Sequence, residues 1–88
     1  MKIKNGFAKR NIAGNEIVVP VGKTALEFNG MITLNETGSF IWDCLKEETT
    51  EQEIVARLLA EYEVTEEKAT ADVSKFVAML RENDLIEK

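Results

Sequence analysis

The chain contains no histidine and a single cysteine among its 88 residues. One thiol cannot form an internal disulfide, and zinc sites need several Cys or His ligands, so the composition excludes both kinds of cross-link. It also excludes catalysis by a histidine acid or base. Cys44 falls within an apolar helical pattern, which predicts a core residue. We therefore expect no metal and no cofactor.

Long apolar runs are also missing. No run approaches the roughly 20 residues that a membrane-spanning helix needs. The first residues lack the apolar stretch of a signal peptide. These two absences predict a cytoplasmic protein with no membrane partner. The chain length and the 44% of hydrophobic residues predict one small folded domain spanning residues 1–88.

Charge is distributed unevenly along the chain. Residues 1–34 hold five Lys or Arg against two Glu, which gives +3, and residues 35–88 hold six basic against fourteen acidic residues, which gives −8. The net charge is −5. The C-terminal half therefore repels a polyanion.

The first third of the sequence has the pattern of β-strands. Residues 7–12 and 16–21 flank the pair Gly14-Asn15, which predicts a hairpin because tight turns between strands need positive φ. Pro20 has no N–H group and is expected to end the second strand. A third extended region covers residues 25–34, of which residues 31–34 are the better strand candidate. The pair Asn29-Gly30 interrupts this region and forms either a turn or a bulge.

Three helices are predicted to follow. Each begins at a residue whose side chain can accept a hydrogen bond from the first turn: Asn35, Thr50 and Thr65. Asn83 is the expected end of the last helix. Trp42 lies off the apolar stripe of the first helix, which predicts partial exposure. The result is an α+β fold, a three-stranded antiparallel sheet followed by three helices (βββααα), similar to a winged helix-turn-helix.

Enzymatic activity has little support in this pattern. Acidic residues are abundant, but they lie on polar helix faces or in loops, where solvated surface is the ordinary interpretation. The sequence has no Gly-rich phosphate loop and no nucleophile–base pair. We therefore expect a protein that is not an enzyme.

Three binding roles stay open from the residues alone. A nucleic-acid-binding winged helix would need a basic face, which only five residues could supply: Lys2, Lys4, Lys9, Arg10 and Lys23. A structural or dimerising subunit would be indicated by an exposed Trp42. A peptide-binding module would use an edge of the sheet, where an extended peptide gains backbone hydrogen bonds.

The last helix carries a mixed strip that suits the third role. At about 100° per residue, Asp72, Lys75 and Met79 fall beside the core stripe, next to Phe76. The strip is either an ordinary core boundary or one wall of a groove, and Phe76 also fits a wholly buried position.

Taken together, these segments resemble the PqqD-like family. The resemblance covers nearly the whole chain in the order and spacing of its parts. They are Val18-Val19-Pro20, Ile32 to Gly38 followed by Phe40-Ile41-Trp42, Thr50 to Tyr62, the Asp-Val-x-x-Phe pattern of Asp72, Val73 and Phe76, and Leu85-Ile86. The family often has Asp-Gly before the second helix, where this chain has Lys46-Glu47-Glu48-Thr49. This difference favours a member of the family that acts outside quinone cofactor synthesis.

The resemblance implies an adaptor that holds the leader of a ribosomally made precursor peptide for a modifying enzyme. In many relatives that enzyme is a radical SAM protein, which carries the iron–sulfur chemistry itself. The leader adds as a strand beside the third strand and packs on the last helix. The implied peptide-binding residues are Phe28, Met31, Ile32, Thr33, Leu34, Asp72, Lys75, Phe76 and Met79. The implied partners are the peptide and the enzyme. The net charge of −8 over residues 35–88 separately argues against nucleic acid as a partner.

Overall fold

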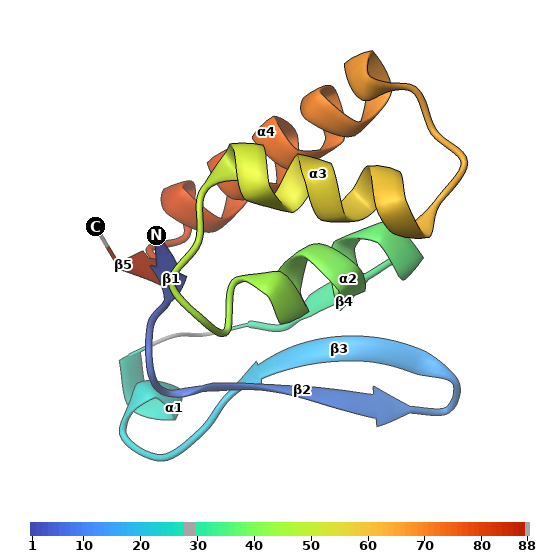
Figure 1. Ribbon diagram of the computed structural model, residues 1–88. Coiled ribbons are helices and arrows are strands. Elements are labelled where there is room, and N and C mark those ends of the chain that lie inside the picture. Colours follow the sequence, from blue (N-terminus) through green and yellow to red (C-terminus); the bar gives the residue numbers. More distant parts are fainter. Residues whose placement is uncertain (28–29, 88) are drawn as a thin grey trace.

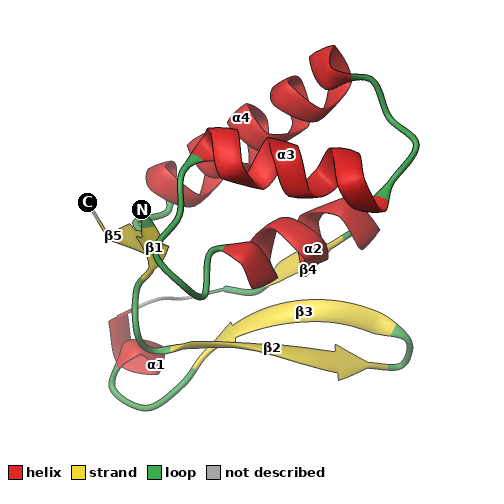
Figure 2. Ribbon diagram, viewed as in Figure 1, coloured by secondary structure: helices red, strands yellow, loops and turns green. Residues whose placement is uncertain are grey.

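The long helices lie on one side of a small sheet (Figure 1). The computed structural model describes residues 1–27 and 30–87. The elements in chain order are β1 (Lys2–Ile3), β2 (Phe7–Ile12), β3 (Asn15–Pro20), α1 (Thr24–Glu27), β4 (Ile32–Leu34), α2 (Glu36–Cys44), α3 (Glu51–Glu61), α4 (Glu66–Glu82) and β5 (Ile86–Glu87). Figure 2 shows α2 between the β2–β3 hairpin and the pair of α3 and α4. The predicted α+β class and three-stranded antiparallel sheet are confirmed.

The predicted order βββααα is incomplete. A short helix, α1, occupies part of the region that was expected to be extended, and Asn29 lies outside the described residues together with Phe28. The two-residue strands β1 and β5 pair with each other, Ile3 opposite Ile86, and bring the ends of the described chain together. Strands and helices this short show no periodic pattern in a sequence, which is why neither was expected.

The hairpin turn lies one residue earlier than predicted. Ala13 and Gly14 form it, with φ of 52° and 84°, and Asn15 already belongs to β3, opposite Ile12. Positive φ at both central residues is the type I′ geometry, whose twist matches that of the flanking strands. The Asn11 side chain accepts a hydrogen bond from the Gly14 N–H at 3.3 Å, which helps to hold alanine in this unfavourable conformation.

β3 is the central strand, with β2 and β4 on its two sides. Val21 donates a hydrogen bond to the Gly6 carbonyl at 2.8 Å just beyond the hairpin, so the next pair, Phe7 and Pro20, is a non-hydrogen-bonded pair. This position suits proline, which has no N–H to donate. Bonded and non-bonded pairs alternate in an antiparallel ladder.

The same alternation fixes the outer edge of β4. Val18 opposes Ile32 and Ile17 opposes Thr33. Counted from the hairpin, Val18 directs its N–H and C=O toward β4, so Ile32 bonds to β3 and Thr33 is in a non-bonded pair. The backbone N–H and C=O of Thr33 therefore face the open edge of the sheet.

Side-chain caps begin the three long helices as predicted. The side-chain oxygen Oδ1 of Asn35 accepts from the Gly38 N–H at 2.7 Å, and the hydroxyls of Thr50 and Thr65 accept from the backbone N–H three residues on. Each satisfies a donor that the first turn leaves without an intrahelical partner. In the described part of the chain, no helix combines the length and the apolar character needed to cross a membrane.

Trp42 lies in the core with 2% of its surface exposed, so the predicted partial exposure is wrong. An exposed Trp42 would have indicated a dimerising subunit, and the buried Trp42 does not give this indication. The reason lies in the surroundings of α2. The helices α3 and α4 contact it on one side. On another side, Trp42 lies close to the N-terminal segment and β2, residues 2–10. A helix covered on several sides buries residues off its main apolar stripe, as the buried set Gly38, Ile41, Trp42 and Cys44 demonstrates.

An ion pair joins the sheet to α2. The Lys9 ammonium on β2 lies 2.8 Å from the Asp43 carboxylate and 2.8 Å from the Ser39 hydroxyl. Burial raises the pKa of Asp43, but the hydrogen bonds and charges of Lys9 and Lys46 outweigh it, so the pKa lies below its ordinary value.

We expect this pair to make stability depend on acid. A carboxyl whose pKa is lower in the folded state adds stability above its unfolded pKa, about 3.9, and this stability is lost as the pH falls through the folded pKa. Wild type should therefore exceed Asp43→Asn in urea midpoint at about pH 6, with the two converging near about pH 2. The difference should be small, because the Asp43 side chain is 47% exposed to screening solvent. A difference that persists at low pH would show that the contact does not depend on charge.

Candidate peptide-binding groove

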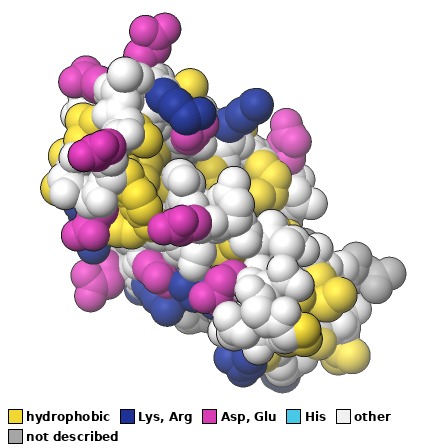
Figure 3. All heavy atoms as spheres, turned by 90° about the vertical axis from the view of Figure 1, so that its right-hand side faces the viewer, with side chains coloured by type: hydrophobic (Ala, Val, Ile, Leu, Met, Phe, Trp, Pro, Cys, Tyr) yellow, Lys and Arg dark blue, Asp and Glu magenta, His cyan; other side chains and the backbone are white. Residues whose placement is uncertain are grey.

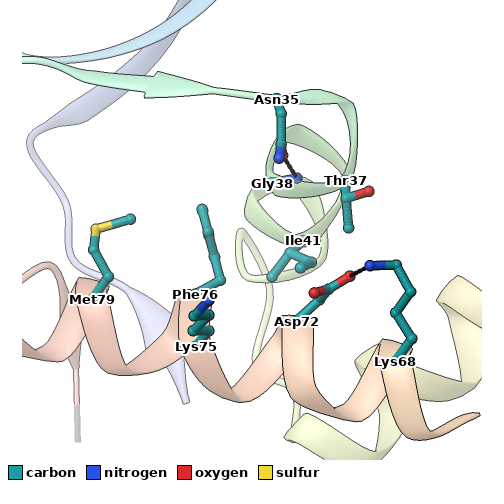
Figure 4. A pocket seen from close by; sticks show the side chains of 9 residues that line it. All are labelled: Asn35, Thr37, Gly38, Ile41, Lys68, Asp72, Lys75, Phe76 and Met79. Carbon is teal, nitrogen blue, oxygen red and sulfur yellow. Dashed lines mark hydrogen bonds and ion pairs between the residues drawn. The ribbon is translucent and has the colours of Figure 1, made fainter.

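A groove of about 530 Å³ lies between the first turn of α2 and α4 (Figure 4). Its walls mix apolar, polar and charged side chains. The residues that line it are Asn35, Thr37, Gly38, Ile41, Lys68, Asp72, Lys75, Phe76 and Met79. The groove is therefore open to a ligand along the side of α4 that faces α2.

All four predicted residues of the last helix line this groove. Asp72, Lys75, Phe76 and Met79 lie along α4 as the helical period requires. Phe76 and Met79 are half-buried and pack against the core, while their remaining surface borders the groove. The two interpretations of this strip, core boundary and groove wall, thus both apply to it.

The predicted strand residues have a different position. Met31 is 67% exposed and Thr33 is exposed, whereas Leu34 is buried and Ile32 half-buried in the core. None of the four lines the groove, but Figure 4 shows Met79 and Phe76 pointing from α4 toward the side along which β4 runs. The side chains of Ile32 and Leu34 therefore support the fold, and only backbone and exposed groups of β4 are available to a ligand. Phe28 lies outside the described residues.

Five groove residues were not predicted. Four come from the start of α2 and its cap, namely Asn35, Thr37, Gly38 and Ile41, and the fifth is Lys68 on α4. Lys68 could have been found, since it lies four residues before Asp72 on the same helix face. The α2 wall could not, because only the tertiary packing of α2 on α4 places it there.

Gly38 shapes the groove through its missing side chain. A Cβ built at this position would lie 3.0 Å from the Asn35 side-chain oxygen and 3.2 Å from a ring carbon of Phe76. Both distances are tighter than ordinary van der Waals contact. Glycine therefore lets the Phe76 ring rest against the first turn of α2 while the Asn35 cap stays in place.

The groove is locally positive on an acidic protein. Lys68 lies 3.9 Å from Asp72, which is the only carboxylate among the described lining residues, and Lys75 makes no ion pair within the described part of the chain. Elsewhere acidic side chains are spread over the surface, as the face in Figure 3 illustrates. Lys75 is thus available to a carboxylate of a ligand.

Groups suited to metal binding or to reactive-thiol chemistry are scarce. Across residues 1–27 and 30–87, no three His, Cys, Asp or Glu side chains are grouped closely enough to hold a metal ion. Cys44 is buried, and burial raises the pKa of its thiol, which disfavours the thiolate.

Comparison with known proteins identifies the family. Residues 17–86 match the family described as coenzyme PQQ synthesis protein D (PqqD). The chain belongs to the PqqD family. The range matched by the PqqD family includes both helices whose residues line the groove, α2 and α4, and the strand β4. No curated protein matches the chain.

Two solved structures share this PqqD-family fold. TbiB1, in complex with the TbiA(beta) leader peptide, is 26% identical, with a TM-score of 0.76 over 99% of this chain and 95% of its own. A lasso peptide synthetase B1 complexed with the leader peptide is 18% identical, with a TM-score of 0.76 over 99% of this chain and 96% of its own. At 18% identity, the second similarity shows the fold alone. Both matched regions include the groove and the open edge of β4.

Proposed function

We propose that this PqqD-family protein is a non-catalytic adaptor that binds the leader of a ribosomally made precursor peptide and presents it to a modifying enzyme. The open edge of β4 beside the α4 groove is the observation that carries the proposal. The similarity to TbiB1, which holds a leader peptide, supports it over nearly the whole chain. The lack of histidine and the buried cysteine favour a role without catalysis.

In the proposed complex the leader adds as a fourth strand next to β4. The outward N–H and C=O of Thr33 bond to the leader backbone, and Phe76 and Met79 receive its apolar side chains. Lys75 pairs with an acidic leader residue, and Asp72 with a basic one. This arrangement assigns sequence selectivity to α4 and backbone affinity to β4.

We also propose that the fold is related to the winged helix-turn-helix. The four-residue connection 62–65 between α3 and α4 supports this, as does the β2–β3 hairpin, which corresponds to the wing. A radical SAM enzyme is the proposed partner, on the strength of the family resemblance. The cytoplasmic location stays a prediction from the sequence.

A titration followed by NMR tests the adaptor role. The ¹⁵N-labelled protein is titrated with the leader segment of a precursor peptide encoded beside its gene, and with a scrambled peptide of the same composition. Amide shifts concentrated on Met31 to Leu34 and on Asp72 to Met79, with an affinity of about micromolar, are expected for the leader alone. Equal shifts with the scrambled peptide, or none with any local leader, would remove the proposal.

Reversing the charge of Lys75 should weaken leader binding. Lys75→Glu turns an unpaired cation of the groove into an anion three residues from Asp72, so we expect about a fivefold rise in Kd. Isothermal titration calorimetry measures the change. Arg81→Glu is the matched control, since Arg81 is exposed on the same helix but does not line the groove. Equal losses in the two variants, or a comparable loss of folding stability, would exclude Lys75 from the site.

A further inference from the structure

The sheet has a second open edge at β2, on the side away from β4. Within the described residues no strand pairs with the outer side of β2. The alternation that starts at the bonded pair Gly6 and Val21 places Lys9 in a non-bonded pair with Val18, and Asn11 in another with Glu16. The N–H and C=O groups of Lys9 and Asn11 therefore face outward.

A basic hollow of about 370 Å³ lies beside this edge. It is formed by the N-terminal segment, β2 and the end of α2. The cations that line it are Lys2, Lys4, Lys9, Arg10 and Lys46, and no carboxylate is among its described lining residues. On a chain of net charge −5, this is a marked local excess of positive charge.

The cations of the hollow differ in how far they are already paired. Lys4 lies 2.6 Å from Asp84, and Asp43 takes both Lys9 at 2.8 Å and Lys46 at 3.4 Å. Arg10 is exposed and forms no ion pair with any described residue. Its guanidinium donates a hydrogen bond to the carbonyl of Lys9 at 3.4 Å. Arg10 is thus the cation most available to an anionic ligand.

We propose that β2 binds an extended acidic segment of a partner protein by strand addition, on the edge opposite the leader site. An open edge presents both donors and acceptors, which an extended peptide satisfies and a phosphate backbone, with acceptors only, does not. A second copy of β2 would set Lys9 and Arg10 against their own like charges. An acidic strand from another protein fits both the edge and the charge.

Strand addition at β2 goes beyond the proposed adaptor function, and only the assignment of the acidic segment to the modifying enzyme rests on that function. If β2 and β4 were occupied at once, the sheet would carry one added strand at each edge. The acidic segment and the leader would then be separated by the three strands β2, β3 and β4. An enzyme that carried the acidic segment would then lie at a fixed distance from a peptide bound at β4. The surface is therefore a site for the modifying enzyme rather than for its substrate.

A charge-matched set of synthetic peptides tests the inference on the full chain. The probe is a peptide of about eight residues that alternates valine and glutamate, long enough to cover one strand. Its controls are the valine–lysine peptide, the valine–glutamate peptide with N-methyl groups on alternate residues, and a short DNA duplex. We expect amide shifts over Phe7 to Asn11 and at Lys46 with the first peptide alone. Arg10→Glu should weaken that binding about fivefold, and Arg81→Glu should leave it unchanged.

Each other result overturns the proposal. Equal binding of the N-methylated peptide would mean attraction by charge without strand addition. Shifts confined to β4 and α4 would place the acidic peptide in the leader groove. Shifts over β2 with DNA as large as those with the peptide would identify a surface for polyanions. If no ligand caused shifts, the cations would serve to prevent the edge from pairing with other copies of the chain.

Discussion

A proline in place of Thr33 is expected to weaken leader binding about tenfold or more. The N–H of Thr33 faces the open edge of β4, and proline both removes this donor and places its ring where the added strand would lie. One backbone hydrogen bond contributes about 1 kcal/mol net, and tenfold in Kd corresponds to about 1.4 kcal/mol. The lost bond and the steric block together reach that range.

The same substitution should leave the protein folded. Thr33 is in a non-bonded pair with Ile17, so proline removes no hydrogen bond between β3 and β4. The Thr33 side chain is exposed and contributes nothing to the core. Edge strands are also the positions in a sheet that tolerate proline.

Thr33→Val is the matched control for this experiment. Valine keeps the β-branched shape and the backbone N–H, so its Kd should stay near that of wild type. Isothermal titration calorimetry gives the affinities, and circular dichroism confirms that both variants are folded. If Thr33→Pro is folded and binds as Thr33→Val does, the leader does not add to β4, and any binding would have to use the α4 groove alone.

Local signals in the sequence predicted much of the fold. A cap such as Thr50 or Thr65 depends on hydrogen bonds within one helical turn, so its signal lies within four residues of sequence. The hairpin depends on a turn and two neighbouring strands, and only its register was missed, because a left-handed Ala13 is not typical of that position. The helical period placed Asp72, Lys75, Phe76 and Met79 on one strip for the same reason, and the family resemblance then assigned this strip to a groove wall.

Features that depend on distant segments could not be predicted. The opposite wall of the groove requires α2 to pack on α4, and the β1–β5 pair joins positions more than eighty residues apart, as Lys2 and Glu87 show. Met31 to Leu34 were predicted to bind the peptide by strand addition, and this stays a prediction. The core-facing side chains of Ile32 and Leu34 were not foreseen, and alternation along β4 accounts for them. Which face of a strand is covered depends on the helices above it, and this information is not local.

Replacement of Trp42 by alanine is expected to remove much of the stability of the protein. A buried Trp→Ala change costs about 3–5 kcal/mol, the sum of lost apolar burial and the cavity left behind. An 88-residue domain has a total free energy of unfolding of about 4–13 kcal/mol. The variant should therefore melt well over about ten degrees lower, or fail to fold at all. Urea unfolding followed by circular dichroism measures this, since the variant retains no tryptophan for fluorescence.

Two further variants make this result decisive about where Trp42 lies. Leu59→Ala removes a side chain that is 36% exposed, so it should cost about 1 kcal/mol or less, while Trp42→Phe keeps an aromatic ring in the core and should fall between the two. The helical pattern of α2 alone places Trp42 off the apolar stripe, and a partly exposed tryptophan would cost as little as Leu59. A loss several times that of Leu59→Ala is therefore expected for a buried Trp42, and equal losses would mean that Trp42 is not buried.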